Sequence, residues 1–442
     1  MMVLRIKDNT TYAKDTFTTV QSVTKKIADQ TLGQLEREGI FVFPETITSA
    51  ADITNEQMVL RSKNNCYCTC NVMGFLGYGQ EHLIIESRFS TGRRDNFFQY
   101  LLEKVLALPN VVNLNTNASQ EYHLFDWSAL LLPYFLKKAM RKGVFKTYVR
   151  HQYNDNHVKG VIDVARHVRT NTPFIGKVAY NQREFAYDNQ LTELIRHTIE
   201  FIKAKPYGQR LLRSVKMEVG AIIAATNKYE FYARTKVIAI NKKNPVRHAY
   251  YHEYGMLQKL CLMILQHDKY QIGLGVHQVQ GILFDGAWLW EEYVNLLIGD
   301  SFHHPRNKGG EGAQELFNKD DGGQIGLIYP DFISQNSTSR VIADTKYKPQ
   351  NNIGNKDYLQ VLAYMFRFDA KKGFYLYPES SETNDLKLFL NSGSTYDDNV
   401  VARSDILLIK CGLKIPYDIE DYGEFKMAMT QNEAIFKQTI LN

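Results

Sequence analysis

Long apolar runs, a signal-like segment and a disulfide framework are all missing from this sequence. No stretch of its 442 residues approaches the roughly 18–20 consecutive apolar residues of a membrane span. The first residues lack the apolar core that a signal peptide needs. Five cysteines in so long a chain provide no disulfide framework. We therefore expect a cytoplasmic protein in a reducing compartment, with no membrane segment.

Several motifs of nucleotide and metal chemistry are missing as well. The P-loop pattern G-x-x-x-x-G-K-[ST] does not occur, so whatever nucleoside triphosphate the system uses is not bound here by a P-loop. His252–Glu253 begins an H-E-x-x-H zinc motif, but Met256 stands where the second His is needed. The acidic run that begins at Asn318 has Tyr329 where a Ca²⁺ loop needs Glu. These classes of site are excluded.

Three cysteines are concentrated near the N-terminus. Cys66, Cys68 and Cys70 alternate with other residues, which predicts one face of a strand. Zinc and iron–sulfur sites usually space their ligands as C-x₂₋₄-C, and side chains along one strand cannot easily surround an ion. Core packing is the better interpretation. A second strand over residues 83–89 completes a small β-rich unit.

What the sequence does contain is a strong asymmetry of charge. Residues 141–250 hold 21 Lys and Arg against 8 Asp and Glu, whereas the rest of the chain holds 32 against 39. A basic segment between acidic flanks suggests an anionic partner, and nucleic acid is the first candidate. A basic domain that is merely soluble is the alternative. The length leaves room for two or three domains.

Within the basic segment we expect a strand over residues 144–149, a hairpin partner over 158–163, and helices near 191–202, 209–225 and 248–268. Basic residues, Asn and Tyr are interleaved before the first helix, which suits phosphate contacts and base stacking. The candidate DNA contacts in this segment are Arg166, Arg169, Lys177 and Arg183. An equally good alternative is a buried ion-pair cluster of Asp163, Arg183, Glu184 and Asp188.

The stretch with the clearest chemical potential is residues 328–349. It predicts two short strands joined by a polar turn. Asp331 lies as far before the centre of the turn as Asp344 lies after it. In an antiparallel hairpin the two carboxylates would stand opposite each other, about 5 Å apart on one face. Lys346 follows Asp344 by two residues and shares that face.

Two carboxylates this close repel each other unless a cation lies between them. Hard oxygen ligands of this kind suit Mg²⁺. The alternative is a solvated hairpin with its charges on the outside. The apolar residues around both aspartates predict strands that are buried on both sides, and charges in such a place are rarely idle.

Predicted helices flank this hairpin on both sides. Residues 287–298 form an amphipathic helix from which Glu291 or Glu292 can reach inward. Residues 355–368 form the next helix, with Gln360 and Tyr364 on one face. Its predicted packing residues are Leu359, Leu362, Ala363 and Phe366. Strands near 373–378, 386–389 and 405–410 and a helix over 424–441 complete the chain.

Helix, strand, strand, helix and strand follow one another here. With Pro330–Asp331 and then Asp-x-Lys thirteen residues on, this order resembles the PD-(D/E)xK nucleases. The resemblance implies that an acidic residue of the preceding helix also reaches the metals, and Glu291 fits better than Glu292. Gln360 and Tyr364 resemble the Gln-x-x-x-Tyr motif of the RecB-like branch, where it adjoins the active site and contacts DNA.

The wider chain resembles the McrC family, the nuclease subunit of modification-dependent restriction systems, which is close to the LlaJI type. The resemblance covers roughly residues 65–375. It is carried by Leu-Trp-Glu-Glu-Tyr-Val, Asp-Thr-Lys-Tyr and the pieces at 160–163, 166–167, 171–174, 183–184, 188–189 and 194–200.

This resemblance implies a partner and a division of labour. In the family an AAA+ GTPase hexamer, McrB, recognises DNA and translocates, and the N-terminal part of McrC docks on that ring and stimulates hydrolysis. We therefore expect a multidomain α+β or α/β chain with three regions. These are a β-rich partner-binding region over 1–125, a basic, mostly helical middle region over 126–270, and a PD-(D/E)xK restriction-endonuclease-like domain over 271–442.

The resemblance also implies the chemistry. Asp331, Asp344, Glu291 and the carbonyl of Thr345 would hold one or two Mg²⁺ ions. Lys346 would orient the attacking water or stabilise developing charge, so that double-stranded DNA is cut endonucleolytically. The alternatives are a RecB-like nuclease of another DNA-processing complex and a non-catalytic scaffold for DNA or an ATPase.

Overall fold

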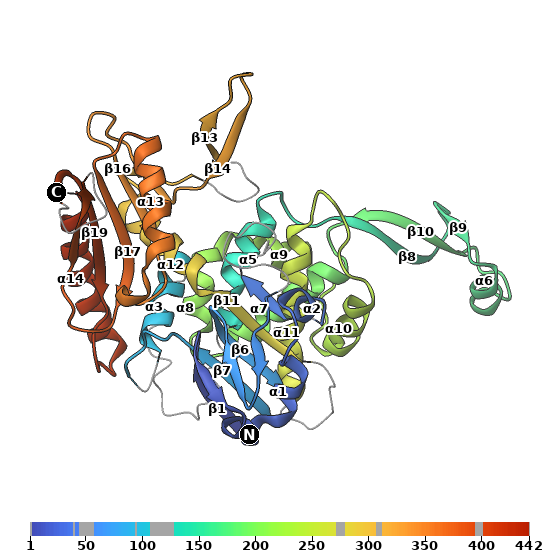
Figure 1. The fold of residues 1–442 in the computed structure, drawn as a ribbon. Helices are drawn as coiled ribbons and strands as arrows, with labels where there is room; N and C mark the ends of the chain where they lie inside the picture. The colour runs from blue at the N-terminus through green and yellow to red at the C-terminus, as the bar shows by residue number, and fades with distance from the viewer. Residues whose placement is uncertain are drawn as a thin grey trace. The chain divides into compact units, whose positions relative to one another are not determined.

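The computed structural model describes residues 2–38, 40–43, 57–92, 95–106, 128–270, 279–305, 312–393 and 401–441 (Figure 1). Its contacts divide the chain into two compact units. One unit joins Met1–Thr116 to Val276–Asn442, and the other is Asn117–Gly275. The first unit is therefore built from both ends of the chain.

A five-stranded sheet, in the order β1-β7-β6-β11-β3, forms one part of the first unit. β1 pairs with β7 and β11 pairs with β3 in parallel, whereas β6 runs antiparallel to β7 and β11. Gly74 is required in β6, because its φ is +143° and a Cβ there would lie 2.0 Å from the carbonyl oxygen of Ile282. The strands are β1 Met2–Lys7, β3 Phe41–Phe43, β6 Val72–Tyr78, β7 Glu81–Glu86 and β11 Gln280–Asp285.

Short helices and a small second sheet pack against these strands. The second sheet has the order β2-β5-β4, with β2 Thr11–Ala13, β4 Leu60–Lys63 and β5 Cys66–Thr69. The helices are η1 Lys14–Val20, α1 Gln21–Ile27 and α2 Leu32–Glu38. They share one apolar core with the five-stranded sheet, which includes Val20, Val23, Ile27, Leu35, Leu76 and Leu83. The strand predicted for the three cysteines is confirmed for Cys66 and Cys68, whereas Cys70 follows the end of β5; all three are free thiols.

The placement of β11 differs from the predicted division of the chain. Residues 271–442 were expected to form a region separate from 1–125, but β11 lies between β6 and β3 in the N-terminal sheet. Its residues Gly281–Asp285 are all buried, so this apolar strand needs neighbours on both edges and both faces. The compact units therefore follow tertiary pairing rather than chain order. The functional roles assigned to the three regions stay predictions.

A six-stranded mixed sheet forms the other part of the first unit, in the order β12-β15-β16-β17-β19-β18. β16, β17 and β19 are parallel, and the remaining pairs are antiparallel. Most of β17 is buried, as expected for a central parallel strand. The strands are β12 Phe302–His303, β15 Phe332–Ser334, β16 Val341–Thr345, β17 Lys372–Glu379, β18 Leu386–Ser392 and β19 Val401–Lys414. A separate hairpin consists of β13 Gln314–Asn318 and β14 Gln324–Ile328.

Helices cover this sheet. α13 (Asn355–Arg367) follows β16, and its Val361, Tyr364 and Met365 share a core with Ile342 of β16 and residues of β17 (Figure 1). The predicted packing face of this helix is wrong at two positions, because Leu359 is 70% exposed and Phe366 is 89% exposed. The amphipathic period was correct, but the helix is rotated so that Tyr364 rather than Phe366 fills the core.

Three further helices meet around one buried carboxylate. They are α3 (Asn96–Val105), α12 (Gly286–Ile298) and α14 (Tyr422–Leu441). Glu433 of α14 accepts hydrogen bonds from the hydroxyl of Tyr100 at 2.6 Å and the hydroxyl of Tyr293 at 2.7 Å. Burial and this carboxylate raise the pKa of both phenols. A helix from the N-terminal part thus packs directly against the helix that carries Glu291.

The second unit has a helical body. α7 contacts α8, α9, α10 and α11, and α11 also contacts α5. Asn189 caps α7 and forms a reciprocal capping box with Thr192. Pro133 lies in the first turn of α5, where its missing N–H costs no hydrogen bond. The helices are α5 Leu132–Met140, α7 Gln190–Lys203, α8 Gly208–Leu212, η3 Arg213–Val215, α9 Lys216–Ala225, η4 Phe231–Ala233, α10 Arg234–Lys243 and α11 Glu253–Tyr270.

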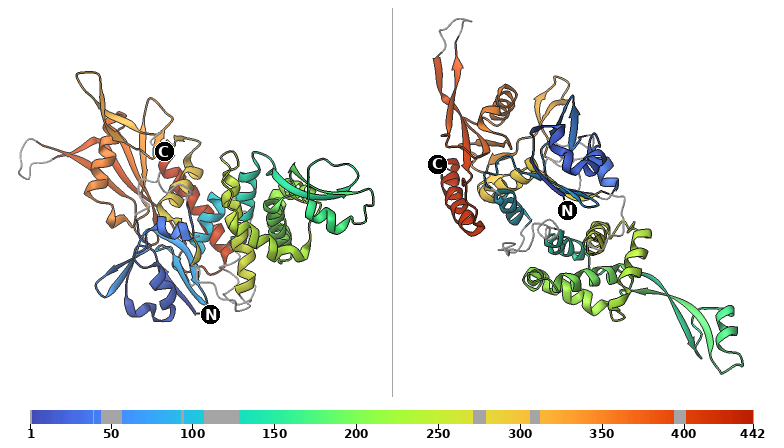
Figure 2. Two further views of the ribbon diagram at one scale, coloured as in Figure 1. Left: turned by 90° about the vertical axis from the view of Figure 1, so that its right-hand side faces the viewer. Right: turned by 90° about the horizontal axis from the view of Figure 1, so that it is seen from below.

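A long β-arm extends from this body. β8 (Thr147–Asp155) pairs with β10 (Val178–Ala186) along its whole length, and β9 (Val161–Ile162) pairs with the other edge of β10. Together with α6 (Val164–Thr170) these strands reach away from the helices of the unit (Figures 1 and 2). The predicted hairpin of residues 144–149 with 158–163 is wrong. β10 offers β8 a complete ladder of nine residues, whereas residues 158–163 contribute a two-residue strand.

A mixed α/β chain with several sheets agrees with the predicted multidomain α+β class. The described helices include none that combines the length and the apolar composition needed to cross a membrane.

Replacing Glu433 tests the meeting of α3, α12 and α14. Glu433→Ala leaves the buried hydroxyls of Tyr100 and Tyr293 without their acceptor, which costs about 1–3 kcal/mol for each. We expect a clearly lower midpoint in thermal unfolding. Gln431→Ala, at an exposed position of the same helix, should change stability by no more than about 0.5 kcal/mol. Equal midpoints for the two variants would contradict this packing.

Candidate active site

The hairpin of β15 and β16 brings two aspartates together. Phe332 pairs with Ala343 and Ile333 pairs with Ile342, so the same register places Asp331 opposite Asp344. Thr345 donates its backbone N–H and its hydroxyl to Oδ2 of Asp331, both at 2.7 Å. The predicted strand pairing is confirmed, and Asp331 is held by the end of the opposing strand.

The negative charge of Asp344 is in an unfavourable place, because its side chain is buried beside a second carboxylate. Its side chain is 1% exposed, and Lys346 Nζ lies 2.6 Å from its Oδ2. Its Oδ1 is buried and accepts no hydrogen bond from any described residue. Burial, and then the charge of Asp331, raise the pKa of Asp344 to about 7, although Lys346 opposes both. An orphaned buried oxygen beside a second carboxylate is the arrangement that a cation would relieve.

Asp357 and Lys348 extend this charge network, and the sequence did not single them out. Asp357 lies in the first turn of α13, with Oδ2 2.7 Å from Lys348 Nζ and Oδ1 3.9 Å from Lys346 Nζ. Burial favours a raised pKa for Asp357, but the bonds from Lys348 and from the N–H of Gly354 hold that pKa below its ordinary value. Asp357 is thus an anion that helps to fix the position of Lys346.

Gln360 and Tyr364 adjoin the site, as the resemblance to the RecB-like branch implied. Lys346 Nζ donates to Oε1 of Gln360 at 3.3 Å, and Nε2 of Gln360 lies 2.6 Å from the hydroxyl of Tyr364. Gln360 is exposed, whereas Tyr364 is only 3% exposed. Burial raises the pKa of Tyr364 to about 12. The buried Tyr364 holds Gln360 through this hydrogen bond, and Gln360 is the member of the pair that is exposed to solvent.

Glu291 reaches the hairpin through a histidine that the sequence did not reveal. His304 Nε2 lies 3.6 Å from Glu291 Oε1, and Nδ1 lies 2.8 Å from the backbone carbonyl of Asp331. Its ring stacks on Phe332, with ring centres 4.7 Å apart. His304 therefore ties the helix that carries Glu291 to the strand that follows Asp331.

The described side chains do not form a complete set of metal ligands. Among the residues that the structure describes, no three His, Cys, Asp or Glu side chains converge closely enough to hold a metal ion. Asp331 and Asp344 face each other, and Glu291 stands by His304. The donor set of carboxylate oxygens nevertheless fits Mg²⁺ rather than a softer metal.

The predicted DNA contacts of the arm fall into two groups. Arg166 donates to the backbone carbonyls of Tyr180 at 2.7 Å and Tyr153 at 3.2 Å and pairs with Asp163 at 3.5 Å. Its guanidinium therefore holds α6 against β8 and β10. By contrast, the other three candidates are exposed, namely Arg169, Lys177 and Arg183.

The alternative of a buried ion-pair cluster is wrong for these residues. Asp163 pairs with Arg166 and remains 26% exposed, and Arg183 is exposed. Glu184 accepts a hydrogen bond from Tyr153, and Asp188 accepts one from the N–H of Lys228. The acidic residues thus have separate partners and do not form one cluster.

The far end of the arm is apolar as well as exposed. Its exposed apolar side chains, which we call the arm tip, are 43–76% accessible. Exposed apolar side chains that form a contiguous patch mark a surface for interaction with another molecule. The arm tip consists of Val158, Val161, Ile162, Val164, Val168, Phe174 and Ile175.

Comparison with known proteins identifies the family of this chain. The model of a family described as "McrBC 5-methylcytosine restriction system component" matches residues 68–378, which is more than half of the chain. The protein is therefore a component of a restriction system. Within that class, it belongs to the McrBC family.

Two solved structures are also similar to the chain. One is a refined half-complex from the tetradecameric assembly of Thermococcus gammatolerans McrB AAA+ hexamers with bound McrC, with a TM-score of 0.47 and 13% identity over 97% of this chain and 99% of that chain. The other is a cryo-EM structure of the Thermococcus gammatolerans McrBC complex, with a TM-score of 0.32 and 13% identity over 67% of this chain and 87% of that chain. No curated protein matches the sequence significantly. The family assignment rests on the match to the family model.

The raised pKa of Asp344 predicts a pH-dependent stability. A carboxyl group whose pKa rises from 3.8 to about 7 on folding stabilises the protein fully below the unfolded pKa. That contribution is lost as the pH rises through about 7. With a chelator present, the wild-type unfolding midpoint should fall between about pH 5 and pH 8 more than the midpoint of Asp344→Asn, which cannot ionise. Parallel curves for the two proteins would contradict the burial of this charge.

Proposed function

We propose that this chain is the Mg²⁺-dependent endonuclease subunit of a McrBC-like restriction system that acts on double-stranded DNA in the cytoplasm. The observation that carries the proposal is the convergence of Asp331, Asp344 and Lys346 at the end of one hairpin, with Oδ1 of the buried Asp344 left without a partner. The order α12, β15, β16, α13, β17 supports a PD-(D/E)xK arrangement of this part of the chain.

Each residue of the site has a role in this proposal. Asp331, Asp344, Glu291 and the carbonyl of Thr345 would hold one or two Mg²⁺ ions. Bound Mg²⁺ supplies Lewis acidity, which activates water at neutral pH and offsets phosphate charge. Lys346, whose ammonium is fixed between Asp344 and Gln360, orients the attacking water or stabilises the charge that develops on the phosphate.

Neighbouring residues position these groups. Asp357 and Lys348 restrict the ammonium of Lys346, since a charged lysine between two carboxylates loses little freedom on reaching its working position. His304 holds Glu291 near the backbone of Asp331. Gln360 is placed to contact the DNA backbone, with Tyr364 as its support.

The arm would also contact the DNA. Arg169, Lys177 and Arg183 are exposed cations that suit phosphate contacts, whereas Arg166 keeps α6 in place. Phosphate contacts of this kind add affinity without reading sequence. Choice of the modified base is therefore assigned to the partner.

The partner in this proposal is a McrB-like AAA+ GTPase hexamer. The chain lacks a P-loop, so a second protein must bind the nucleotide. The two similar solved structures are complexes of McrB and McrC. The arm tip is the best docking surface that the second unit offers, and it lies outside the region 1–125 for which docking was predicted from the sequence.

Two other functions compete with this one. A non-catalytic scaffold would not need the full set of Asp331, Asp344 and Lys346 in one place, so the intact set favours an enzyme. A RecB-like nuclease that needs DNA ends is distinguished by its substrate, because only an endonuclease cuts a closed circular plasmid.

One experiment decides among these functions. Closed circular plasmid, with and without cytosine methylation, is incubated with the chain, its AAA+ partner and GTP, and each component is omitted in turn. Cutting is expected only with Mg²⁺, the partner, GTP and the modified plasmid together. Cutting of linear DNA alone would favour the end-dependent alternative, and no cutting under any condition would favour the scaffold.

Variants of the hairpin test the catalytic assignment. Asp344→Ala and Lys346→Ala should each lower the cleavage rate by at least about 100-fold, because each removes a group that acts in the transition state. The partner's GTP hydrolysis should still be stimulated, since neither side chain lies on the arm. Cleavage at the wild-type rate by both variants would disprove the assignment.

Charges at the arm tip test the docking surface. Val161→Asp combined with Ile162→Asp should abolish partner-dependent cleavage and GTPase stimulation, because burying two carboxylates at an apolar contact is unfavourable. The matched control is Val401→Asp, at another exposed valine that lies in the first unit. The control should behave as the wild type. Unchanged GTPase stimulation in the double variant would exclude the arm tip.

A further inference from the structure

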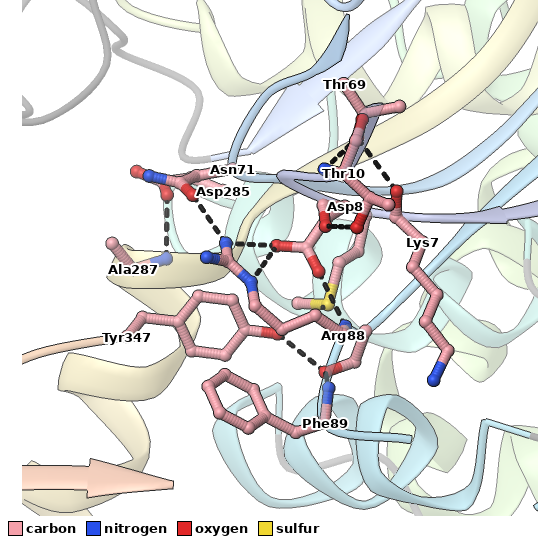
Figure 3. A network of polar contacts seen from close by, with 12 residues as sticks. Lys7, Asp8, Thr10, Thr69, Asn71, Arg88, Phe89, Asp285, Ala287 and Tyr347 are labelled. Atoms are coloured by element: carbon pink, nitrogen blue, oxygen red, sulfur yellow. Dashed lines mark hydrogen bonds and ion pairs between the residues drawn. The ribbon is translucent and has the colours of Figure 1, made fainter. Parts of the chain in front are cut away.

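A buried ion pair joins the ends of two strands of the N-terminal sheet (Figure 3). Asp8 follows β1 and Arg88 follows β7, and these strands are parallel neighbours in which Lys7 pairs with Glu86. Asp8 is fully buried. Its Oδ1 accepts the backbone N–H of Arg88 at 2.6 Å, and its Oδ2 accepts from Nε of Arg88 at 3.0 Å and also from Nη2. The guanidinium is therefore held in a forked geometry.

The same guanidinium contacts two further groups. Nη2 of Arg88 also donates to the side-chain oxygen of Asn71, and its Cζ lies 5.0 Å from the ring centre of Tyr347 (Figure 3). Tyr347 directly follows Lys346 in the chain. The ion pair of the N-terminal sheet thus meets the residue next to the proposed catalytic lysine.

Tyr347 is fixed from several sides. It is 5% exposed, its hydroxyl lies 2.7 Å from Oγ of Ser87, and its ring packs edge-on against Phe89 at 5.1 Å. The backbone N–H of Lys346 donates to the carbonyl of Leu376 in β17 at 2.9 Å. Because successive side chains of an extended chain point to opposite sides, anchoring Tyr347 in the N-terminal sheet directs Lys346 toward Asp344.

The start of α12 belongs to the same arrangement. Gly286 packs so closely on Tyr347 that a Cβ atom on Gly286 would lie 2.6 Å from the tyrosine ring. The backbone N–H of Gly286 donates to the carbonyl of Asn71 at 2.9 Å. α12 carries Glu291. It also carries Trp290, whose Nε1 donates at 3.0 Å to the Leu376 carbonyl that accepts from Lys346.

We infer that Asp8, Arg88 and Tyr347 form a positioning unit through which the N-terminal sheet sets the places of Lys346 and of the Glu291 helix. The inference rests on the proposed nuclease function. It assigns residues outside the hairpin to the cutting reaction, as positioning residues that touch neither substrate nor metal. The apolar core of the N-terminal sheet is built from other residues, and the net stability that a buried ion pair supplies is often small, because the cost of desolvation offsets the attraction.

The chain offers a matched control for this ion pair. Arg5 of β1 forms an ion pair with Glu86 of β7, between the same two strands, but at a more exposed place. Arg5→Gln therefore removes an arginine–carboxylate pair from the same sheet and leaves the contacts of Tyr347 intact. Any effect on cutting that is specific to Arg88→Gln reports on the contacts of Arg88 with Asp8, Tyr347 and Asn71.

The test uses the full chain with its AAA+ partner, GTP, Mg²⁺ and modified plasmid. A displacement of about 1 Å at a reacting group can cost about 100-fold in rate. Arg88→Gln should lower kcat by about 10- to 100-fold and change the KM for DNA by less than about twofold. Arg88→Lys, which keeps the charge but loses the fork, should lower kcat less. Arg5→Gln should match the wild type, and the stimulated GTPase rate should be the same in all four proteins.

Hydrogen exchange provides a readout that does not depend on activity. The amide of Lys346 should exchange faster in Arg88→Gln than in the wild type, and at the wild-type rate in Arg5→Gln. If Arg88→Gln does not fold, Tyr347→Phe decides, because it keeps the ring and the ion pair and removes only the contacts of the hydroxyl with Ser87 and with Sδ of Met73. It should lower kcat several-fold and raise exchange at Lys346.

The outcomes separate this inference from the proposed function. If the wild type cuts, Asp344→Ala does not, and Arg88→Gln keeps the wild-type kcat and exchange rate, the nuclease stands and the positioning unit is overturned. If the wild type does not cut, the proposed function fails, and the inference about cutting fails with it. In that case faster exchange in Arg88→Gln alone still supports the structural link from Arg88 to Lys346, and unchanged exchange overturns that link too.

Discussion

The repulsion between Asp331 and Asp344 is the constraint on which the rest of the site depends. Two carboxylates that face each other on a buried surface are stable only if the surrounding chain forces them together. β16 does this because it is bonded to β15 on one side and to β17 on the other. Thr345 donates a hydrogen bond to the carboxylate of Asp331, and the ammonium of Lys346 offsets the negative charge of Asp344. Asp357 in turn limits the positions that the ammonium of Lys346 can take. Remove the sheet pairing and no local interaction would keep these charges in place.

The parts of the site that could be predicted from the sequence are those with a local geometric rule. The symmetry of the hairpin fixed the register of Asp331 and Asp344, and the one-turn spacing placed Gln360 beside Tyr364. His304 and Tyr347 could not be predicted, because their contacts depend on tertiary packing between segments far apart in the chain. Asp357 carried a weak signal, since it shares a helix face with Gln360 and Tyr364.

The same distinction holds for the fold. Most helices and strands follow from apolar periodicity, and so does the general α+β class. The partner of β8 did not follow, because two candidate strands lay downstream and only the longer one completes the ladder. Nor did the central place of β11, since an apolar strand is compatible with either sheet. The rotation of α13 was wrong because Leu359 and Phe366 are as apolar as the residues that fill its core.

The arm has a consequence for the solubility of the chain. Within the described part of the chain, β8 is bonded to another strand on one edge only, and the ribbon ends in seven exposed apolar side chains. An open strand edge and an apolar tip are both starting points for aggregation. A chain whose arm is uncovered is therefore open to self-association.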